Sequence, residues 1–414
     1  MRLLYLTVLL GNFILISGEK VRYDNYHVYS INVESAKQLK VLQDLKNSHD
    51  GILFMETPIS LGKPIDIVVS PHKFTNISAL FNAYEIKNEI KIENLQTLID
   101  AEQPEVLCSS FDWKQYHDTA AIYKWLDELI RRHRKILTDY TYGRSYENRP
   151  LRAVKLSHKA GNPTIFIEST IHAREWITVA TATYILNELL TSRDAEIKAL
   201  AKNFDWVFVP IVNVDGYEFA HTTNRLWRKN RNPYSDMWNC VGADLNRNFD
   251  FHHTEEGSST DSCDETYAGP SSFSEPETLA LSKFIKTFDN IKLYLSFHSY
   301  SQLLLFPYGH STAVHATNHD DLYQIGQKTT QAIKRRYGTD YTTGNIAETI
   351  YLASGNSIDW VYAAHNVSLT YTFEFRDNGH FGFILPADQI IPNSLEVIDG
   401  LKAMINEAKL LQYL

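Results

Sequence analysis

Apolar and polar positions alternate in two different ways along the chain, and the change falls near residue 110. In the first part, residues 26–33 alternate with the period of a half-buried strand, and residues 35–46 carry apolar side chains at helical spacing. Further patterns predict a strand over 66–70, a helix over 75–83 and an amphipathic segment over 92–99. Together they predict a small α+β unit that contains no cluster of side chains suited to catalysis.

Longer apolar runs and longer amphipathic segments fill the second part of the chain. The predicted strands cover 164–167, 206–212, 291–297 and 367–375, and the predicted helices cover 119–137, 177–190, 275–287 and 322–337. Strand–helix alternation on this scale predicts a single large α/β domain with a mixed, largely parallel central sheet flanked by helices. The polar residues 101–110, which include Pro104, are typical of a linker.

The N-terminal residues have the pattern of a secretion signal. Residues 1–18 hold one positive charge at Arg2, then a mostly apolar run closed by Ser17 and Gly18, which is typical of a signal peptide. A membrane anchor is the alternative, but the run is short for the roughly 20 apolar residues of a span, and Asn12 interrupts it. We therefore expect a secreted, extracellular protein that is not held in a membrane.

Composition and charge narrow the class of protein. The chain has 414 residues, of which 44% are hydrophobic and 21% charged, which excludes a mainly disordered chain and a disulfide-dense mini-protein. The formal net charge of −9 argues against a nucleic-acid partner, because such partners favour a basic surface. The sequons at Asn76 and Asn366 are compatible with secretion.

Three cysteines allow one disulfide in an oxidising compartment. Cys240 and Cys263 enclose a polar stretch that suits a stapled loop, and this pairing leaves Cys108 over. Zinc binding by the three cysteines is the competing interpretation, but no C-x-x-C spacing supports it.

Four metal-binding or acid–base side chains follow predicted strands. His172 and Glu175 are three residues apart just after the strand at 164–167, while His298 and Glu374 stand at the ends of two other apolar runs. Ligands in open α/β sheets bind at the carboxyl ends of strands, so we expect these side chains to meet. Two histidines and a glutamate can hold zinc, and the second glutamate can serve as a general base. Singly, each of these residues has an ordinary structural interpretation as a polar neighbour.

Two polar clusters, 224–231 and 244–248, lie between these strand ends. Taken alone, each is typical of a solvated loop. A hydrolase needs a cation near the developing oxyanion, and a planar arginine suits a carboxylate. Asp244 can orient a histidine ligand of a metal from behind.

The motifs, taken in order, resemble one family. H-A-R-E-W, N-R-L-W-R-K-N-R, D-L-N-R-N-F-D, F-H-S-Y-S-Q, I-Y-x-A-S-G-x-S-I-D-W and F-E-F-R-D are similar to the zinc metallocarboxypeptidases of the pancreatic carboxypeptidase A/B type. The resemblance covers nearly the whole chain. It implies an inhibitory prosegment at 19–108 and a catalytic domain at 109–414, after the signal peptide at 1–18.

The resemblance also implies roles for matching residues. His172, Glu175 and His298 would bind one Zn²⁺, and Asp244 would hydrogen-bond His172. Glu374 would take the proton from water and pass it to the leaving amine, while Arg228 would hold the oxyanion. The substrate's terminal carboxylate would be held by Asn246, Arg247 and Tyr351, with Arg174 in the next subsite inward.

Side-chain preference within this family depends on the base of one pocket, where an acidic residue selects Lys or Arg. The matching position here is Ile358, and Ile346, Leu305 and Thr372 would line the same pocket, so the resemblance implies aromatic or branched aliphatic C-terminal residues. Asp359 is the competing candidate, but it falls just past the pocket position. Asn356 stands where a small residue is common and could narrow the pocket.

Partners follow from the same resemblance. We expect peptide or protein C-termini as substrates, the prosegment as an intramolecular inhibitor, a separate activating protease and a monomeric enzyme. Because no Lys or Arg lies between Lys91 and Lys114, the cut is expected between about Glu102 and Ser110 by a protease that is not trypsin-like. A binding protein without turnover is one alternative, and the presence of all three zinc ligands and the base argues against it. A hydrolase of non-peptide amides or esters is the other, and the presence of all three residues that would hold a terminal carboxylate argues against it.

Overall fold

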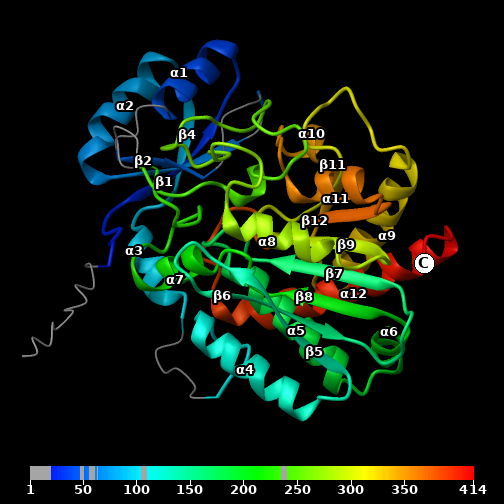
Figure 1. Cartoon of the computed structure of the whole chain (residues 1–414). Coiled ribbons are helices and arrows are strands. Elements are labelled where there is room, and N and C mark those ends of the chain that lie inside the picture. The colour runs from blue at the N-terminus through cyan, green and yellow to red at the C-terminus, as the bar shows by residue number, and fades with distance from the viewer. Residues whose placement is uncertain (1–19, 47–50, 56–60, 63, 104–109, 235–239) are drawn as a thin grey trace, which may run out of the picture.

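The computed structural model describes residues 20–46, 51–55, 61–62, 64–103, 110–234 and 240–414, coloured from blue to red in Figure 1. The predicted signal peptide, Cys108 and most of the segment expected to hold the activation cut lie outside the described residues. No helix among the described residues is both long enough and apolar enough to cross a membrane.

A four-stranded antiparallel sheet with two helices packed on it forms most of the N-terminal unit, which comprises the described residues up to Gln103. The strands lie in the order β2 (Ile52–Phe54), β3 (Pro64–Val69), β1 (His27–Asn32) and β4 (Lys87–Ile92), and the helices are α1 (Ala36–Lys46) and α2 (Phe74–Ala83). A short 3₁₀ helix, η1 (Pro71–Lys73), precedes α2. The predicted elements at 26–33, 35–46, 66–70 and 75–83 are therefore present, whereas β2 and the polar strand β4 carry no apolar alternation and were not predicted.

The two faces of this small sheet pack against different partners. Tyr29 and Ile67 face the helices, with Leu42, Ile77 and Phe81. The alternate positions Val28 and Val68 share an apolar cluster with Leu226, Tyr300 and Phe383 of the large unit. Because strand side chains alternate between faces, a single sheet makes both its own core and a contact with the rest of the chain.

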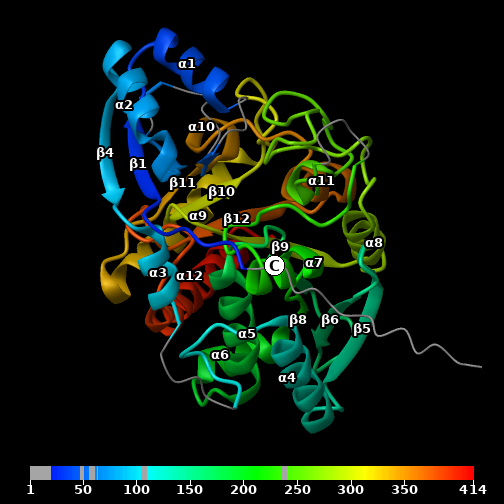
Figure 2. The same ribbon diagram turned by 90° about the vertical axis from the view of Figure 1, so that its left-hand side faces the viewer.

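The end of the N-terminal unit differs from the sequence prediction. The predicted amphipathic segment 92–99 begins as the last residue of β4 and becomes helical only at α3 (Leu95–Ala101). Asn94 caps this helix by accepting a hydrogen bond from the backbone N–H of Gln96, at 3.2 Å. Helix α3 leads the chain toward the large unit, as Figure 2 shows.

An eight-stranded mixed sheet forms the centre of the large unit. Its order is β11 (Thr342–Asn345), β10 (Leu303–Phe306), β12 (Leu369–Phe375), β9 (Ile291–Ser299), β7 (Thr164–Ser169), β8 (Asp205–Val209), β6 (Pro150–Leu156) and β5 (Leu137–Arg144). The four central strands β12, β9, β7 and β8 are parallel. Strands β10, β6 and β5 each pair antiparallel with their inner neighbour, and β11 pairs parallel with β10 at the edge. The predicted α/β class and mixed sheet are confirmed.

Helices cover both faces of this sheet (Figures 1 and 2). The helices on one face share a core with Ile165 and Ile167. They are α4 (Thr119–Arg132), α5 (Trp176–Thr191), α6 (Ala195–Asn203), α7 (Val214–Thr222), α9 (His319–Tyr337) and α12 (Ile390–Leu410). On the other face α8 (Pro276–Ile285) and α11 (Ser357–His365) share a core with Phe166. The remaining helical turns are η2 (Leu245–Arg247), α10 (Ile346–Thr349) and η3 (Ala387–Gln389).

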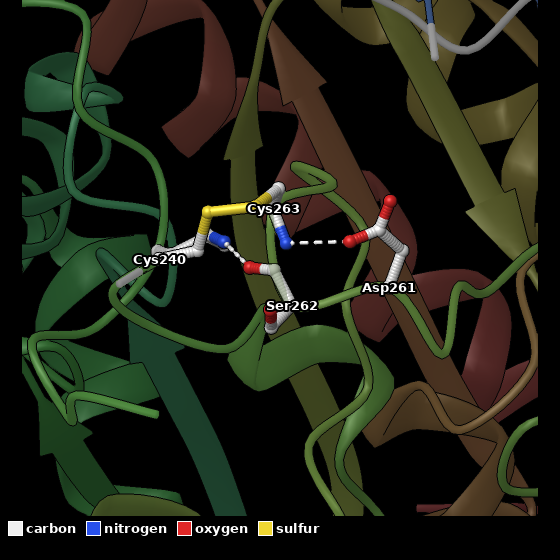
Figure 3. The surroundings of a disulfide bond; sticks show 5 residues. Cys240, Asp261, Ser262 and Cys263 are labelled. Carbon is white, nitrogen blue, oxygen red and sulfur yellow. Dashed lines mark hydrogen bonds between the residues drawn. A yellow bond between two sulfur atoms is a disulfide. The ribbon is translucent and has the colours of Figure 1, made fainter. Parts of the chain in front are cut away.

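The predicted disulfide is present. Cys240 and Cys263 are bonded across Cα atoms 5.1 Å apart, and the backbone N–H of Cys263 donates to Asp261 at 2.9 Å (Figure 3). The adjacent Asp264 pairs with Lys46 of the N-terminal unit, with Nζ and Oδ2 2.6 Å apart. The bonded loop therefore also supports a contact between the two units.

Replacing both bonded cysteines by serine is expected to lower the free energy of unfolding by about 2–4 kcal/mol, because the cross-link restricts the unfolded chain. Denaturant unfolding would measure the loss. A reductant should produce a similar loss in the unchanged protein and none in the double variant. Equal stability of the two proteins under oxidising conditions would contradict the prediction.

Candidate active site

Three side chains with metal-binding atoms meet where two central strands end. His172 and Glu175 lie in the turn between β7 and α5, and His298 lies near the end of the neighbouring parallel strand β9. One potential ligand atom of each residue lies within 4.8 Å of the others. Thr170, with φ of 58°, turns the chain sharply at the end of β7 and is held there by a 3.1 Å hydrogen bond from its N–H to Thr178 Oγ1.

The three side chains point their acceptor atoms at one another. Glu175 lies 2.7 Å from His172 Nδ1 through Oε1 and 3.1 Å from His298 Nδ1 through Oε2. The two Nδ1 atoms are themselves 3.1 Å apart, and all three residues are at most 3% exposed. Two imidazole nitrogens and a carboxylate that converge in a buried site fit zinc.

Charges in the cluster reinforce this arrangement. Burial alone would raise the pKa of Glu175, but His172 and His298 outweigh burial and hold that pKa below its usual value. Burial would lower the pKa of His298, yet Glu175 and the neighbouring carboxylates raise it to about 9. Burial and Arg228 together lower the pKa of His172. Glu175 is therefore an ionised acceptor that favours positive charge at the cluster.

Asp244 lies behind His172. Its Oδ1 is 3.1 Å from His172 Nε2, and its Oδ2 accepts a hydrogen bond from Arg228 Nη2 at 2.7 Å. Despite complete burial, Arg228, His172 and Arg247 keep the pKa of Asp244 well below its ordinary value. Asp244 also caps η2 by accepting from the N–H of Asn246 at 2.8 Å. One carboxylate thus orients a histidine, an arginine and the start of the turn that carries Asn246 and Arg247.

A cavity of about 30 Å³ opens beside these side chains. It is lined by His172, Asn246, Arg247, His298, Leu305, Ile346, Ile350, Tyr351, Ala353, Asn356, Thr372 and Glu374. Glu374 pairs in register with His298 across β12 and β9, and Thr372 pairs with Leu305 across β12 and β10. Glu374 and Thr372 therefore lie on the face of the sheet that carries His298.

The predicted pocket residues do not all lie at the cavity. Ile346, Leu305 and Thr372 line it, whereas Ile358 is 1% exposed and lies in the apolar cluster that also contains Leu305 and Ile346. Asp359 does not line the cavity, and its carboxylate accepts hydrogen bonds from the backbone N–H groups of Gly309 and His310, at 2.9 and 3.3 Å.

Three arginines surround the cluster. Arg228 is held by Asp244, and Arg247 donates to the backbone oxygens of Asn246 and Gly257 at 2.9 and 2.8 Å. The Arg247 guanidinium carbon lies 5.8 Å from the Tyr351 ring. Arg174 is 1% exposed and donates to the backbone oxygen of Met55 at 3.3 Å. Met55 belongs to the N-terminal unit, which therefore covers this side of the site.

The end of the N-terminal unit is fixed by a buried ion pair. Arg225 contacts Glu102 through two hydrogen bonds of 2.7 and 2.5 Å, and both side chains are 2% exposed. The backbone oxygen of Glu102 accepts from Ala387 at 3.1 Å. Gln103 makes two 2.9 Å hydrogen bonds with the backbone of Tyr116. These contacts hold the unit against the large unit beside the candidate site.

Sequence reasoning missed several residues of this region. Ile350 and Ala353 line the cavity, and Glu168 and Ser296 lie behind His298. Ile350 and Ala353 belong to the motif I-Y-x-A-S-G-x-S-I-D-W, but their apolar side chains alone do not indicate that they line a cavity. Glu168 had a usable signal, since an acidic residue directly follows the apolar run 164–167.

Comparisons with known proteins agree with this geometry. Residues 122–400 match the family described as zinc carboxypeptidase, and residues 29–102 match the carboxypeptidase activation peptide. Zinc carboxypeptidase A 1 of Anopheles gambiae is 44% identical over 399 residues, which cover 95% of this chain and 92% of the relative.

Solved structures agree as well. The crystal structure of thrombin activatable fibrinolysis inhibitor is 31% identical, covers 94% of this chain and 100% of its own, and has a TM-score of 0.86. The carboxypeptidase A of Helicoverpa armigera is 27% identical, covers 94% of this chain and 98% of its own, and has a TM-score of 0.83. The likeness extends over both units of the chain.

Proposed function

This chain belongs to the zinc carboxypeptidase family and carries that family's activation peptide, and we propose that it is a secreted zymogen whose enzyme removes aromatic or branched aliphatic residues from peptide C-termini. The observation that carries the proposal is the convergence of His172, Glu175 and His298 beside a cavity that also contains Glu374, Asn246 and Arg247. We assign the first three residues as the zinc ligands.

The chain's own residues divide the work of hydrolysis. Zinc, when bound, polarises a carbonyl and lowers the pKa of water. Glu374, on the face of the sheet that carries His298, accepts a proton from the attacking water and passes it to the departing amine. Arg228, kept in place by Asp244, supplies positive charge to the oxyanion.

A carboxylate clamp explains why only the last peptide bond is cut. Asn246 and Arg247 line the cavity beside His298, and Tyr351 lines the same cavity. A planar guanidinium grips a carboxylate through paired hydrogen bonds, and internal peptide bonds have no such charge nearby. Arg174 serves the next subsite inward. The distance from the clamp to the zinc ligands selects the terminal bond.

The pocket for the terminal side chain is apolar. Leu305, Ile346, Ile350 and Ala353 line the cavity, and Ile358 lies in the cluster behind it. Asp359, the nearest acidic alternative, is occupied by backbone N–H groups. Apart from Glu374, which the reaction uses as its base, no carboxylate of the described residues lines the cavity, which disfavours C-terminal Lys or Arg.

A matched set of peptides that differ only in the C-terminal residue tests the proposal. After activation, release of Phe and Leu should exceed release of Lys and Glu, a chelator should abolish it, and added zinc should restore it. Preferred release of Lys would refute the pocket assignment. Release that survives complete removal of the metal would refute the mechanism.

Latency is expected to depend on the Glu102–Arg225 ion pair. Glu102→Gln should weaken docking of the N-terminal unit by roughly 3–5 kcal/mol, because it leaves a buried arginine without its charged partner. The uncut chain should then hydrolyse a small substrate faster, while the mature enzyme is unchanged because the substitution lies in the removed part. Glu89→Gln, at an exposed position of β4, is the control. Equal activity of the two uncut variants would contradict the role of this pair.

Activation is expected to use a cut between Glu102 and Ser110, by a protease that is not trypsin-like. Lys91 lies in β4 and pairs with Asp66 at 2.9 Å, which protects it. Lys114 is exposed, but a cut there would remove Phe111, which stacks on Trp125 in the core of the large unit, and Trp113, which contacts the same ring edge-on. Sequencing the N-terminus of the mature protein checks this, and a start at Ile92 would disprove it.

A further inference from the structure

Glu168 is a buried carboxylate that the proposed reaction does not use. It lies in β7, is 0% exposed, and forms no ion pair with Lys or Arg among the residues that the structure describes. Burying a carboxylate is costly unless hydrogen bonds or a positive charge compensate it, and burial raises the pKa of Glu168. The contacts of this side chain therefore indicate what it does.

Strand register places Glu168 behind a predicted zinc ligand. Glu168 pairs with Ser296 across the parallel strands β7 and β9, and Ser296 is two residues before His298 on the same face. Ser296 Oγ is hydrogen-bonded to Glu168 Oε1 and lies 2.9 Å from His298 Nε2. These contacts form a continuous chain from the imidazole to the carboxylate.

The direction of the hydrogen bonds follows from the other side of the ring. His298 Nδ1 faces Glu175 and His172, so Nδ1 would be the nitrogen that binds a metal, and with a metal bound there Nε2 would carry the hydrogen. Nε2–H then donates to Ser296, whose hydroxyl donates to Glu168. The arrangement parallels that of His172, whose Nε2 lies 3.1 Å from the carboxylate of Asp244.

We infer that Glu168 is a second positioning carboxylate of the zinc site, which acts on His298 through Ser296 as Asp244 acts directly on His172. This inference rests on the proposed ligand set. Glu168 fixes the tautomer and the angle of the His298 ring and strengthens its Nδ1 as a donor to the metal. Neither Glu168 nor Ser296 touches the substrate in this assignment.

A second contact of Glu168 provides an internal test. Ser357 Oγ donates to Glu168 Oε1 at 3.3 Å from the first turn of α11. If Glu168 mainly supported that helix, Ser357→Ala would reproduce the effects of changing Glu168. Because the inference routes its action through Ser296, Ser357→Ala should leave zinc affinity unchanged.

Zinc dissociation constants of the full chain, measured by competition with a chromophoric chelator, test the inference. Glu168→Gln and Ser296→Ala should each weaken zinc binding by about 10–100-fold, the usual effect of removing a partner behind a metal ligand. The double variant should bind about as weakly as the weaker single variant, because either change breaks the same chain.

Two controls separate this effect from damage to the core. Glu277→Gln changes another fully buried carboxylate, and Ser169→Ala removes a buried hydroxyl that donates to Pro210 at 2.7 Å. Both should bind zinc within twofold of the unchanged protein. The thermal unfolding of metal-free Ser296→Ala should match that of metal-free Ser169→Ala.

Two results would overturn the inference: zinc affinity within twofold of normal in both Glu168→Gln and Ser296→Ala, or an equal loss in the control variants. His298→Ala is included to test the ligand set itself. If this variant binds zinc as tightly as the unchanged protein, the proposed ligand set fails, which is a different outcome from normal binding in the Glu168 and Ser296 variants alone.

Discussion

Glu374→Gln should lower kcat by about 10²–10⁴-fold, the usual contribution of a general acid–base group. Glutamine has nearly the shape of glutamate but cannot accept the proton of water at neutral pH. Glu374 is only 9% exposed and lines the cavity beside His172 and His298. No other carboxylate of the described residues lines that cavity, so none is placed to replace it. Release of a C-terminal Phe from a short peptide would measure the change.

The same variant should keep its zinc, because Glu374 is outside the proposed ligand set. Zinc content and the melting temperature should therefore match those of the unchanged enzyme. Glu407→Gln, in α12, should retain normal turnover, because Glu407 does not line the cavity and its carboxylate accepts a hydrogen bond from Gln324 instead. Turnover of Glu374→Gln within tenfold of normal would remove this residue from its role.

Arg247→Ala should lower kcat/KM for peptides by about 30- to 4,000-fold, because losing one partner of a buried charged hydrogen-bonded pair costs about 2–5 kcal/mol. Arg247 is 3% exposed, and its guanidinium is fixed by the backbone oxygens of Asn246 and Gly257. A fixed fork loses little freedom when it grips a carboxylate. Arg247→Lys keeps the charge without the fork and should show an intermediate loss.

Amidated peptides make this second test specific. With the unchanged enzyme, a C-terminal amide should lose a similar factor, because it removes the same pair from the substrate side. With Arg247→Ala, amidation should cost little more, since the partner is already gone. If amidation costs the variant as much as the unchanged enzyme, the carboxylate is recognised elsewhere.

The fold could be predicted from sequence where side chains repeat with the period of one buried face. The parallel strands β7, β8, β9 and β12 are nearly continuous apolar runs, which is typical of strands covered by helices on both faces. Strand β5 was not predicted, because most of its positions are exposed or half-buried. Strand β4 is polar for the same reason.

Helix α12 shows how tertiary packing overrides local preference. Pro392 and Gly400 both weaken the helical signal of 390–410, and the helix was not predicted. Yet α12 packs on α5 and α9, and a Cβ at Gly400 would lie 2.8 Å from Ile333 of α9. The glycine that obscured the helix permits this close approach.

The candidate site was predictable to the extent that its residues end strands. His172, Glu175, His298 and Glu374 could be found because parallel strands bring their carboxyl ends together. Side-chain direction was not available: nothing in the sequence places Ile358 behind the cavity or aims the Ser296 hydroxyl at Glu168. The Glu102–Arg225 pair depends on how two units dock, which hydrophobic periodicity does not encode.

The buried contacts at the end of the N-terminal unit have a consequence for how activity would appear with time. Before the cut, Glu102 meets Arg225 within one molecule, at an effective concentration of about millimolar. After the cut, the same contact joins two molecules, so its occupancy falls with dilution. We therefore expect freshly cut enzyme to be less active per molecule in concentrated solution and to gain specific activity when diluted, without further proteolysis.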